Sequence, residues 1–208
     1  MLPGTVGVVD YGMGNLLSVL NGFEMVGAKV SLCRGPDDLR IVDRIVLPGV
    51  GAFGACVKSL KARGYWEALS EEVTRKKKPF LGICLGMQVT ARKSTEGGIT
   101  DGLGWFDAEV VRLTPSDPKL RVPQIGWNDV SHEQRGPMHV LSPGTEMYFV
   151  HSYSMRCADQ TDVAATCDYG GPVTAAVLRD NIFAVQFHPE KSQCPGLRLL
   201  ESFAKWRP

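Results

Sequence analysis

The chain has 208 residues, a length that predicts a single domain spanning residues 1–208. Hydrophobic residues make up 44% and charged residues 22%, which is ordinary for a globular protein and excludes disordered and fibrous classes. The formal net charge is only +1, so the chain lacks the field expected of a nucleic-acid or anionic-membrane binder. We therefore expect a small molecule or another protein as the partner, with no nucleic acid and no membrane.

The first half of the chain alternates strands and helices. Apolar runs predict strands over residues 5–9, 28–32, 44–47 and 80–84. Apolar residues at helical spacing predict a helix beginning near Asn15, a second over 66–78 and a third over 85–91. For the lysines at 76–78 we favour a solvated basic helix end over a phosphate or partner site. The alternation predicts an α/β fold, with a central, mostly parallel sheet and helices on both faces.

The second half has strand-like runs with little helix between them. These runs predict antiparallel or mixed strands added to the central sheet, and a final helix follows Pro195. The predicted strands cover residues 108–113, 147–150, 163–166, 174–177 and 182–187.

The six cysteines and the amino-terminal segment bear on the compartment. The cysteines are irregularly spaced without a Cys-x-x-Cys pair, which favours reduced thiols over a disulfide framework or a zinc site. Residues 1–5 do not start a basic and then apolar leader, and no apolar run reaches the roughly 20 residues of a membrane span. We therefore expect a cytoplasmic protein with no metal and no cofactor.

A Gly-x-Cys-x-Gly pattern, with Cys84 between Gly82 and Gly86, stands where a predicted strand meets a predicted helix. Flanking glycines leave room for a strained turn that lifts the central side chain above the sheet. The start of a helix also favours a thiolate and the binding of an anion. The pattern predicts a nucleophile, and the structural alternative is a buried cysteine beside helix-packing glycines.

A cysteine nucleophile needs a base, and His188 is the best placed of the four histidines. It closes the apolar run 182–187, at a strand end where sites in open α/β sheets form. Pro189 holds it extended, so that Glu190 can project to the same side and orient its ring. Cys84, His188 and Glu190 thus fit a nucleophile, base and orienting carboxylate. Alone, His188 could equally be a satisfied packing histidine.

An acyl-transfer site also needs N–H donors for an oxyanion. Residues 48–51 follow a buried strand that we expect beside the strand of Cys84, and their glycines allow close approach of the backbone. We expect the N–H of Val50 or Gly51 to join that of Leu85 in an oxyanion hole. A simple turn at a strand end is the alternative.

The whole chain resembles the class I, triad-type glutamine amidotransferases. Two motifs carry this resemblance, Gly82-Ile83-Cys84-Leu85-Gly86-Met87-Gln88 and Gln186-Phe187-His188-Pro189-Glu190-Lys191-Ser192. Within that class the chain is most similar to the glutaminase subunit of imidazole glycerol phosphate synthase, through segments 10–16, 47–53, 125–128 and 148–153. The resemblance implies a flavodoxin-like amidotransferase fold and hydrolysis of L-glutamine to glutamate and ammonia through a thioester on Cys84.

The resemblance also implies residues that bind glutamine. Gln88 and Glu96 would hold its amino-acid end, helped by the backbone at Ser152 and Tyr153, although Glu96 could equally be a solvated loop acid. One position departs from the family, which commonly has His where Gln124 stands.

The partner implied by the resemblance is a (β/α)8-barrel cyclase subunit. It would use the ammonia to make imidazole glycerol phosphate and an aminoimidazole carboxamide ribonucleotide in histidine biosynthesis, as a heterodimer with this chain. Two alternatives stay open: a triad amidotransferase of anthranilate, guanylate or pyridoxal phosphate synthesis, and a non-catalytic homologue that binds a partner.

Overall fold

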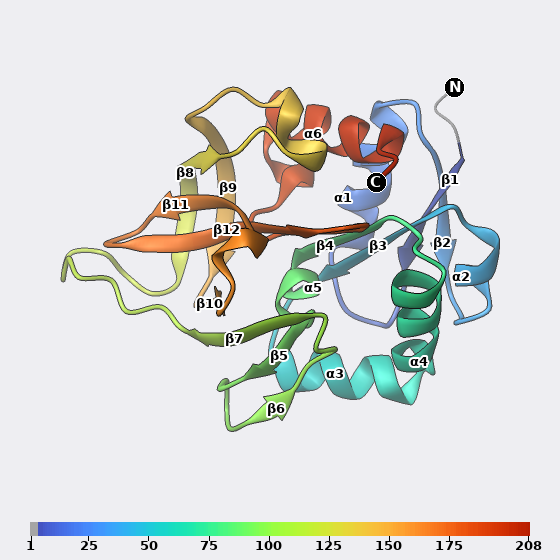
Figure 1. The fold of residues 1–208 in the computed structure, drawn as a ribbon, viewed down its shortest axis with the longest axis horizontal. Coiled ribbons are helices and arrows are strands. Elements are labelled where there is room, and N and C mark those ends of the chain that lie inside the picture. Colours follow the sequence, from blue (N-terminus) through green and yellow to red (C-terminus); the bar gives the residue numbers. More distant parts are fainter. Residues whose placement is uncertain (1–3) are drawn as a thin grey trace.

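A computed structural model of the chain describes residues 4–208. Residues 1–3 lie outside the described residues. They are part of segment 1–5, from which the sequence predicts no leader. The main sheet is mixed and has the strand order β2-β1-β3-β4-β13-β12-β11-β8-β9, and a second sheet has the order β10-β7-β5-β6 (Figure 1). The strands are β1 (Thr5–Val9), β2 (Lys29–Cys33), β3 (Arg44–Gly49), β4 (Phe80–Cys84), β5 (Ala91–Ser94), β6 (Thr100–Asp101), β7 (Phe106–Arg112), β8 (Gln124–His132), β9 (Thr145–His151), β10 (Tyr153–Cys157), β11 (Val163–Asp168), β12 (Pro172–Arg179) and β13 (Ile182–Val185).

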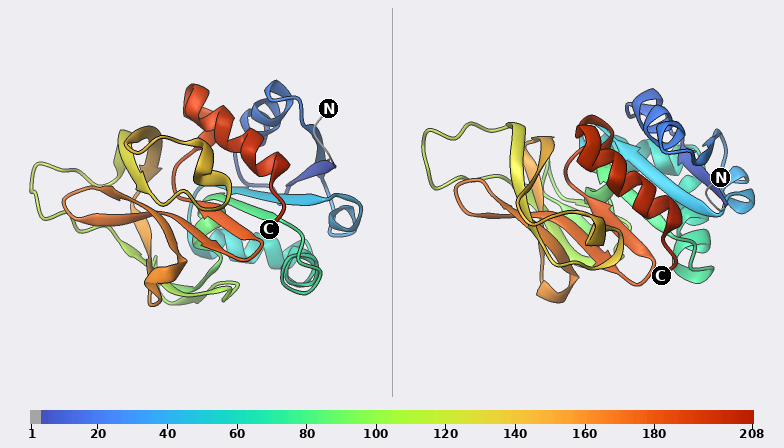
Figure 2. Two further views of the ribbon diagram at one scale, coloured as in Figure 1. Left: turned by 45° about the horizontal axis from the view of Figure 1, so that its top comes forward. Right: turned by 90° about the horizontal axis from the view of Figure 1, so that it is seen from above.

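Helices cover both faces of the parallel half of the main sheet, in which β2, β1, β3, β4 and β13 run the same way. Apolar side chains of α1 and α6 share one core with the sheet, and those of α2, α3 and α4 share the core on the opposite face (Figures 1 and 2). The helices are α1 (Leu16–Met25), α2 (Asp38–Ile41), α3 (Phe53–Ala62), α4 (Tyr65–Leu69), α5 (Leu85–Gln88) and α6 (Gln193–Lys205), with a π-helical segment at Ser70–Arg75 and short 3-10 turns at Gly136–Val140, Gln160–Asp162 and Pro189–Lys191. The α/β fold and its parallel core are confirmed.

The antiparallel half of the main sheet is also confirmed, because β12, β11, β8 and β9 pair antiparallel next to β13. The sequence does not predict the second sheet, in which the predicted strand 108–113 lies as β7, and it does not predict α2, α3, β5, β6, β8 and β10. In β8, residues alternate without a strong apolar face, and one side stays largely open to solvent. Such a strand carries little of the period-two signal on which a sequence-based prediction depends.

Several element bounds differ from the predicted ones, among them those of the helix after Cys84, the strand before His188 and the last helix. The helix after Cys84 ends at Gln88, because Ala91 pairs with Phe106 in the second sheet and tertiary pairing overrides local helix propensity. Strand β13 ends at Val185, two residues before the predicted end. Helix α6 begins at Gln193, so that Pro195 lies in its first turn, where its missing N–H costs no hydrogen bond.

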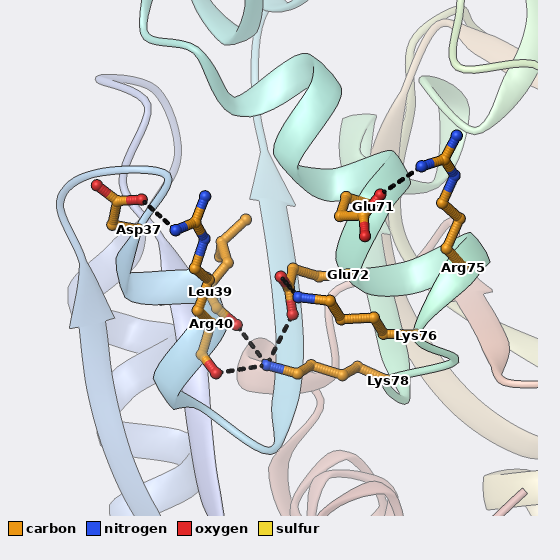
Figure 3. A network of polar contacts seen from close by, with 8 residues as sticks. All are labelled: Asp37, Leu39, Arg40, Glu71, Glu72, Arg75, Lys76 and Lys78. Carbon is orange, nitrogen blue, oxygen red and sulfur yellow. Dashed lines mark hydrogen bonds and ion pairs between the residues drawn. The ribbon is translucent and has the colours of Figure 1, made fainter.

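The lysines at the end of the second predicted helix are not simply solvated. Nζ of Lys76 and Nζ of Lys78 lie 2.7 and 2.9 Å from the carboxylate of Glu72, whose side chain is only 2% exposed (Figure 3). Lys78 also donates to the carbonyl oxygens of Leu39 and Arg40. The basic residues therefore neutralise a buried acid of the π-helical segment and tie it to the α2 region.

All six cysteines carry free thiols, and Cys194 is the exposed one. Within residues 4–208, no group of three histidine, cysteine or acidic side chains is placed to hold a metal ion. None of the helices in this part of the chain is long and apolar enough to cross a membrane. The cytoplasmic setting stays a prediction.

Candidate active site

A cavity of about 330 Å³ opens where β3 and β4 end, a size at the lower end of small-molecule sites. Its wall brings together Cys84 and His188 with every residue expected in the oxyanion hole and around glutamine. Glu190 lies behind His188 and does not line the cavity. The lining residues are Val50, Gly51, Cys84, Leu85, Gln88, Glu96, Pro123, Val150, His151, Ser152, Tyr153 and His188.

Cys84 lies at a strained turn, as the glycine pattern predicts. Its backbone has φ 55° and ψ −110°, a conformation that L-residues rarely adopt. A Cβ on Gly86 would meet the carbonyl oxygen of Leu47 at 1.8 Å, and one on Gly82 would meet that of Gly86 at 2.6 Å. Both glycines are therefore needed for β4 to turn into α5 against β3, and the turn holds the sulfur at the cavity.

The sulfur of Cys84 has two polar neighbours besides His188. The side-chain Nε2 of Gln186 lies 3.6 Å from Sγ, and the carbonyl oxygen of Val150 lies 3.9 Å from it. The helix that follows is a single turn of four residues, Leu85–Gln88, so the helix dipole that we expected to favour a thiolate is short.

Glu190 lies against the ring of His188, but the backbone between them differs from the predicted one. Nδ1 of His188 and Oε1 of Glu190 are 2.7 Å apart, with side chains 3% and 1% exposed. His188 itself is extended, whereas Pro189–Lys191 forms a 3-10 turn that bends the carboxylate back under the ring. The backbone N–H of His188 donates to the carbonyl oxygen of Tyr148, which fixes the residue against β9.

The electrostatics favour a protonated His188. Burial disfavours the imidazolium, but the interactions of the ring with Cys84 and Glu190 outweigh it and raise the pKa of His188 to about 10. Nε2 of His188 is buried without a hydrogen-bond partner among residues 4–208. At neutral pH the ring is therefore protonated, and the proton on Nε2 can pass to a ligand in the cavity.

The oxyanion-hole candidates lie side by side at the ends of two neighbouring strands. Strands β3 and β4 are parallel and pair Gly49 with Cys84, so Val50 follows one strand where Leu85 follows the other. Gly51 has φ 93°, a conformation that glycine adopts without strain. The two segments therefore line adjacent positions on the cavity wall.

Two of the residues expected to bind glutamine already have protein partners. Nε2 of Gln88 donates to the carbonyl oxygen of Tyr153 and to Oε1 of Gln186, both at 2.9 Å. Oε2 of Glu96 accepts from the N–H of Phe53 at 2.7 Å, at the start of α3. That bond holds the carboxylate at the cavity, which favours a ligand-binding acid over a freely solvated one.

His151 lines the cavity, although no role was expected for it. Its Nδ1 lies 2.9 Å from the carbonyl oxygen of Tyr153, and its Nε2 lies 3.1 Å from the side-chain amide of Gln124. Burial lowers the pKa of His151 to about 4, and the charge of His188 adds to the effect. The ring is therefore neutral, and the departure at Gln124 acts on His151 rather than on the proposed triad. His132 and His139 do not line the cavity.

Residues missed by the sequence reasoning include Gln186, Val150 and Pro123. Gln186 belongs to the second motif of the resemblance, but its contact with Cys84 depends on strands that lie about a hundred residues apart in the chain. Val150 and Pro123 line the cavity through loops and strand ends that carry no chemical signal in the sequence.

Comparison with known proteins gives the same family for most of the chain. A family model described as glutamine amidotransferase class-I matches residues 7–205. The chain is 44% identical to imidazole glycerol phosphate synthase subunit HisH of Mesorhizobium japonicum, covering 98% of this chain and 99% of that relative. It is 46% identical to the subunit of the same name from Agrobacterium fabrum, with the same coverage.

Solved structures agree with the fold. PurLQS from Thermotoga maritima superposes with a TM-score of 0.75 at 20% identity, covering 98% of each chain. A structure described as glutamine amidotransferase superposes with a TM-score of 0.74 at 19% identity, covering 96% of this chain and 98% of the other. The chain therefore belongs to the class-I glutamine amidotransferases, and within them to the family of imidazole glycerol phosphate synthase subunit HisH.

Proposed function

We propose that this chain is the glutaminase subunit of an imidazole glycerol phosphate synthase, with Cys84 as nucleophile, His188 as acid and base, and Glu190 as the carboxylate that orients His188. The observation that carries the proposal is the cavity in which the strained Cys84 meets the His188–Glu190 pair. The relatives named HisH support the pathway and the need for a second subunit.

The raised pKa of His188 sets the order of proton transfers. In the reacting form, Sγ of Cys84 is a thiolate and the ring of His188 carries the proton, as the raised pKa of His188 favours. Sγ attacks the side-chain amide carbon of glutamine, and the oxyanion that forms is held by N–H groups of Val50 or Gly51 and Leu85. The C–N bond then breaks, the nitrogen takes the proton of His188 and leaves as ammonia, and a γ-glutamyl thioester remains.

Hydrolysis of the thioester reverses these roles. His188, now neutral, takes a proton from water, the hydroxide attacks the thioester carbon, and the C–S bond breaks. Glutamate leaves, and the thiolate and imidazolium are restored. Glu190 keeps the ring in place throughout, and Glu96 faces the ammonium group of glutamine with the Ser152 and Tyr153 backbone nearby.

The nucleophile is tested by Cys84→Ala in the complex with the cyclase subunit. We expect glutamine-dependent synthesis to fall by at least about 10³-fold, while synthesis from added ammonia is kept. Cys157→Ala, which removes another buried thiol, is the matched control and should keep both activities. Equal loss of both activities in Cys84→Ala would contradict the assignment.

The partner is tested by assaying glutaminase activity of the chain alone and with the cyclase and its nucleotide ligand. We expect weak activity alone and a clear rise in the complex, since the ammonia acceptor is bound by the second polypeptide. Full activity of the isolated chain would favour a glutaminase of anthranilate, guanylate or pyridoxal phosphate synthesis. No activity in either case would favour a non-catalytic homologue.

A further inference from the structure

Gln186 is buried directly beside the sulfur of Cys84. The residue is 0% exposed and follows β13, the strand next to β4. Its Nε2 lies 3.6 Å from Sγ of Cys84, and its Oε1 accepts a hydrogen bond of 2.9 Å from Nε2 of Gln88. Neither end of this amide is free to turn toward water.

The main chain fixes the direction of these hydrogen bonds. The carbonyl oxygen of Tyr153 can only accept, so the group of Gln88 that faces it must be the NH2. The second N–H of that NH2 points at Gln186, whose facing atom must then be its oxygen. The NH2 of Gln186 is therefore turned toward Cys84, and a reversed amide would set donor against donor.

We propose, on the basis of the function proposed above, that Gln186 is a further catalytic residue that donates an N–H hydrogen bond to the Cys84 thiolate, and that Gln88 positions it. The backbone neighbour of the sulfur, the carbonyl oxygen of Val150, can bind only a protonated thiol. Gln186 thus favours the charged form of the sulfur and Val150 the neutral form. The bond also holds Sγ at one place on the cavity wall before glutamine arrives.

The same chain of bonds restricts how Gln88 meets glutamine. Both of its N–H groups are used inside the protein, by Tyr153 and Gln186. Its Oε1 is the group left for a ligand, so Gln88 accepts a hydrogen bond from glutamine and does not donate one.

The test is the pH dependence of alkylation of Cys84 by iodoacetamide in the full chain, because only the thiolate reacts. Modification is followed by mass spectrometry, with the exposed Cys194 as internal reference in every sample. Gln186→Met removes the donor and keeps the volume. We expect the midpoint for Cys84 to rise by about one pH unit, as hydrogen bonds to charged groups contribute tenfold or more to an ionisation.

Asn181→Leu is the matched control, because Asn181 is a buried amide at the other end of β13 that donates to the carbonyl oxygens of Val73 and Lys78. It should lower stability and leave the Cys84 midpoint unchanged. If Gln186→Met does not fold, Gln186→Asn takes its place, because it keeps a buried amide but moves it away from the sulfur. It should shift the midpoint of Cys84 alkylation in the same direction. Gln88→Met should produce a smaller rise, since it only releases the orientation of Gln186.

An unchanged midpoint in a folded Gln186 variant overturns the inference, and so does an equal shift in Asn181→Leu. Failure of the underlying function looks different. If Cys84→Ser keeps glutamine hydrolysis in the complex, the nucleophile assignment fails; if Cys84→Ser loses hydrolysis while Gln186→Met alkylates as the wild type does, Gln186 alone has been misassigned.

Discussion

Among the carboxylates with almost completely buried side chains, Glu72 and Glu190 each face a side chain that can carry a positive charge, yet they differ in what surrounds them. Glu72 is held by Lys76 and Lys78, and Lys78 also donates hydrogen bonds to the backbone carbonyls of Leu39 and Arg40 (Figure 3). Glu190 is held by His188, whose other nitrogen has no hydrogen-bond partner among residues 4–208 and whose ring lines the cavity.

The difference teaches what separates a functional buried pair from a structural one. In both pairs the carboxylate is buried and lies close to its partner, so burial and charge alone do not mark a site. The pair at the cavity adds a group that can give up its proton and a sulfur close enough to respond to its charge. The pair at Glu72 has no reacting neighbour, and Lys78 ties the π-helical segment to the α2 region.

The largest expected effect separates the two pairs by activity. Glu190→Gln keeps an oxygen that can accept from Nδ1 of His188 but removes the charge that supports the imidazolium, and we expect glutaminase kcat/KM in the complex to fall by about 10²–10³-fold. Glu72→Gln makes the same chemical change outside the cavity and should leave kcat/KM within twofold. Comparable losses in the two variants would mean that the contrast between them is wrong.

The sequence predicts the cavity pair better than the Glu72 cluster for a physical reason. The Gly-x-Cys-x-Gly pattern and the order His-Pro-Glu are local, and local spacing determines the turn at Cys84 and the reach of Glu190. Strands β4 and β13 then bring the two motifs together as parallel neighbours, although the sequence places residues 182–187 among the antiparallel or mixed strands. The extended backbone predicted between His188 and Glu190 is nonetheless wrong, because a 3-10 turn brings Glu190 to His188.

What the sequence could not predict depends on contacts between distant segments. Lysines at a helix end are typical of solvent, and only the fold shows that Glu72 is buried beneath them. The second sheet pairs short strands with weak alternation, so α5 ends earlier than helical spacing predicts. Gln186 and Gln88 acquire their roles through one hydrogen bond between residues that lie 98 positions apart.

A smaller effect concerns stability. Glu72→Gln leaves two ammonium groups without their buried anion, and we expect it to lower the free energy of unfolding by about 2 kcal/mol in chemical denaturation. Glu71→Gln is the matched control in the next position, since the Glu71–Arg75 pair is exposed to solvent and contributes less than about 0.5 kcal/mol. Equal changes in the two variants would show that burial adds nothing to the Glu72 pair.

The finest test compares the signs of two pH dependences. Burial alone would raise the pKa of Glu72, but hydrogen bonds from Lys76 and Lys78 outweigh it and hold its pKa below the usual 4.5. The folded chain therefore releases this proton more readily than the unfolded chain, so the contribution of Glu72 to stability is present above about pH 4.5 and is lost as the pH falls through the folded pKa. The stability difference between wild type and Glu72→Gln should accordingly shrink in acid.

The pair at the cavity should behave in the opposite way. The pKa of His188 is raised from 6.5 to about 10, so between these values the folded chain keeps a proton that the unfolded chain has lost. Its contribution to stability is complete below pH 6.5 and is lost as the pH rises toward 10. The difference between wild type and Glu190→Gln should therefore shrink in alkali, where that for Glu72→Gln stays constant. If the stability differences of both variants shrank on the same side of neutral pH, His188 would not be protonated at neutral pH. The thiolate and imidazolium pair of the proposed mechanism would then be contradicted as well.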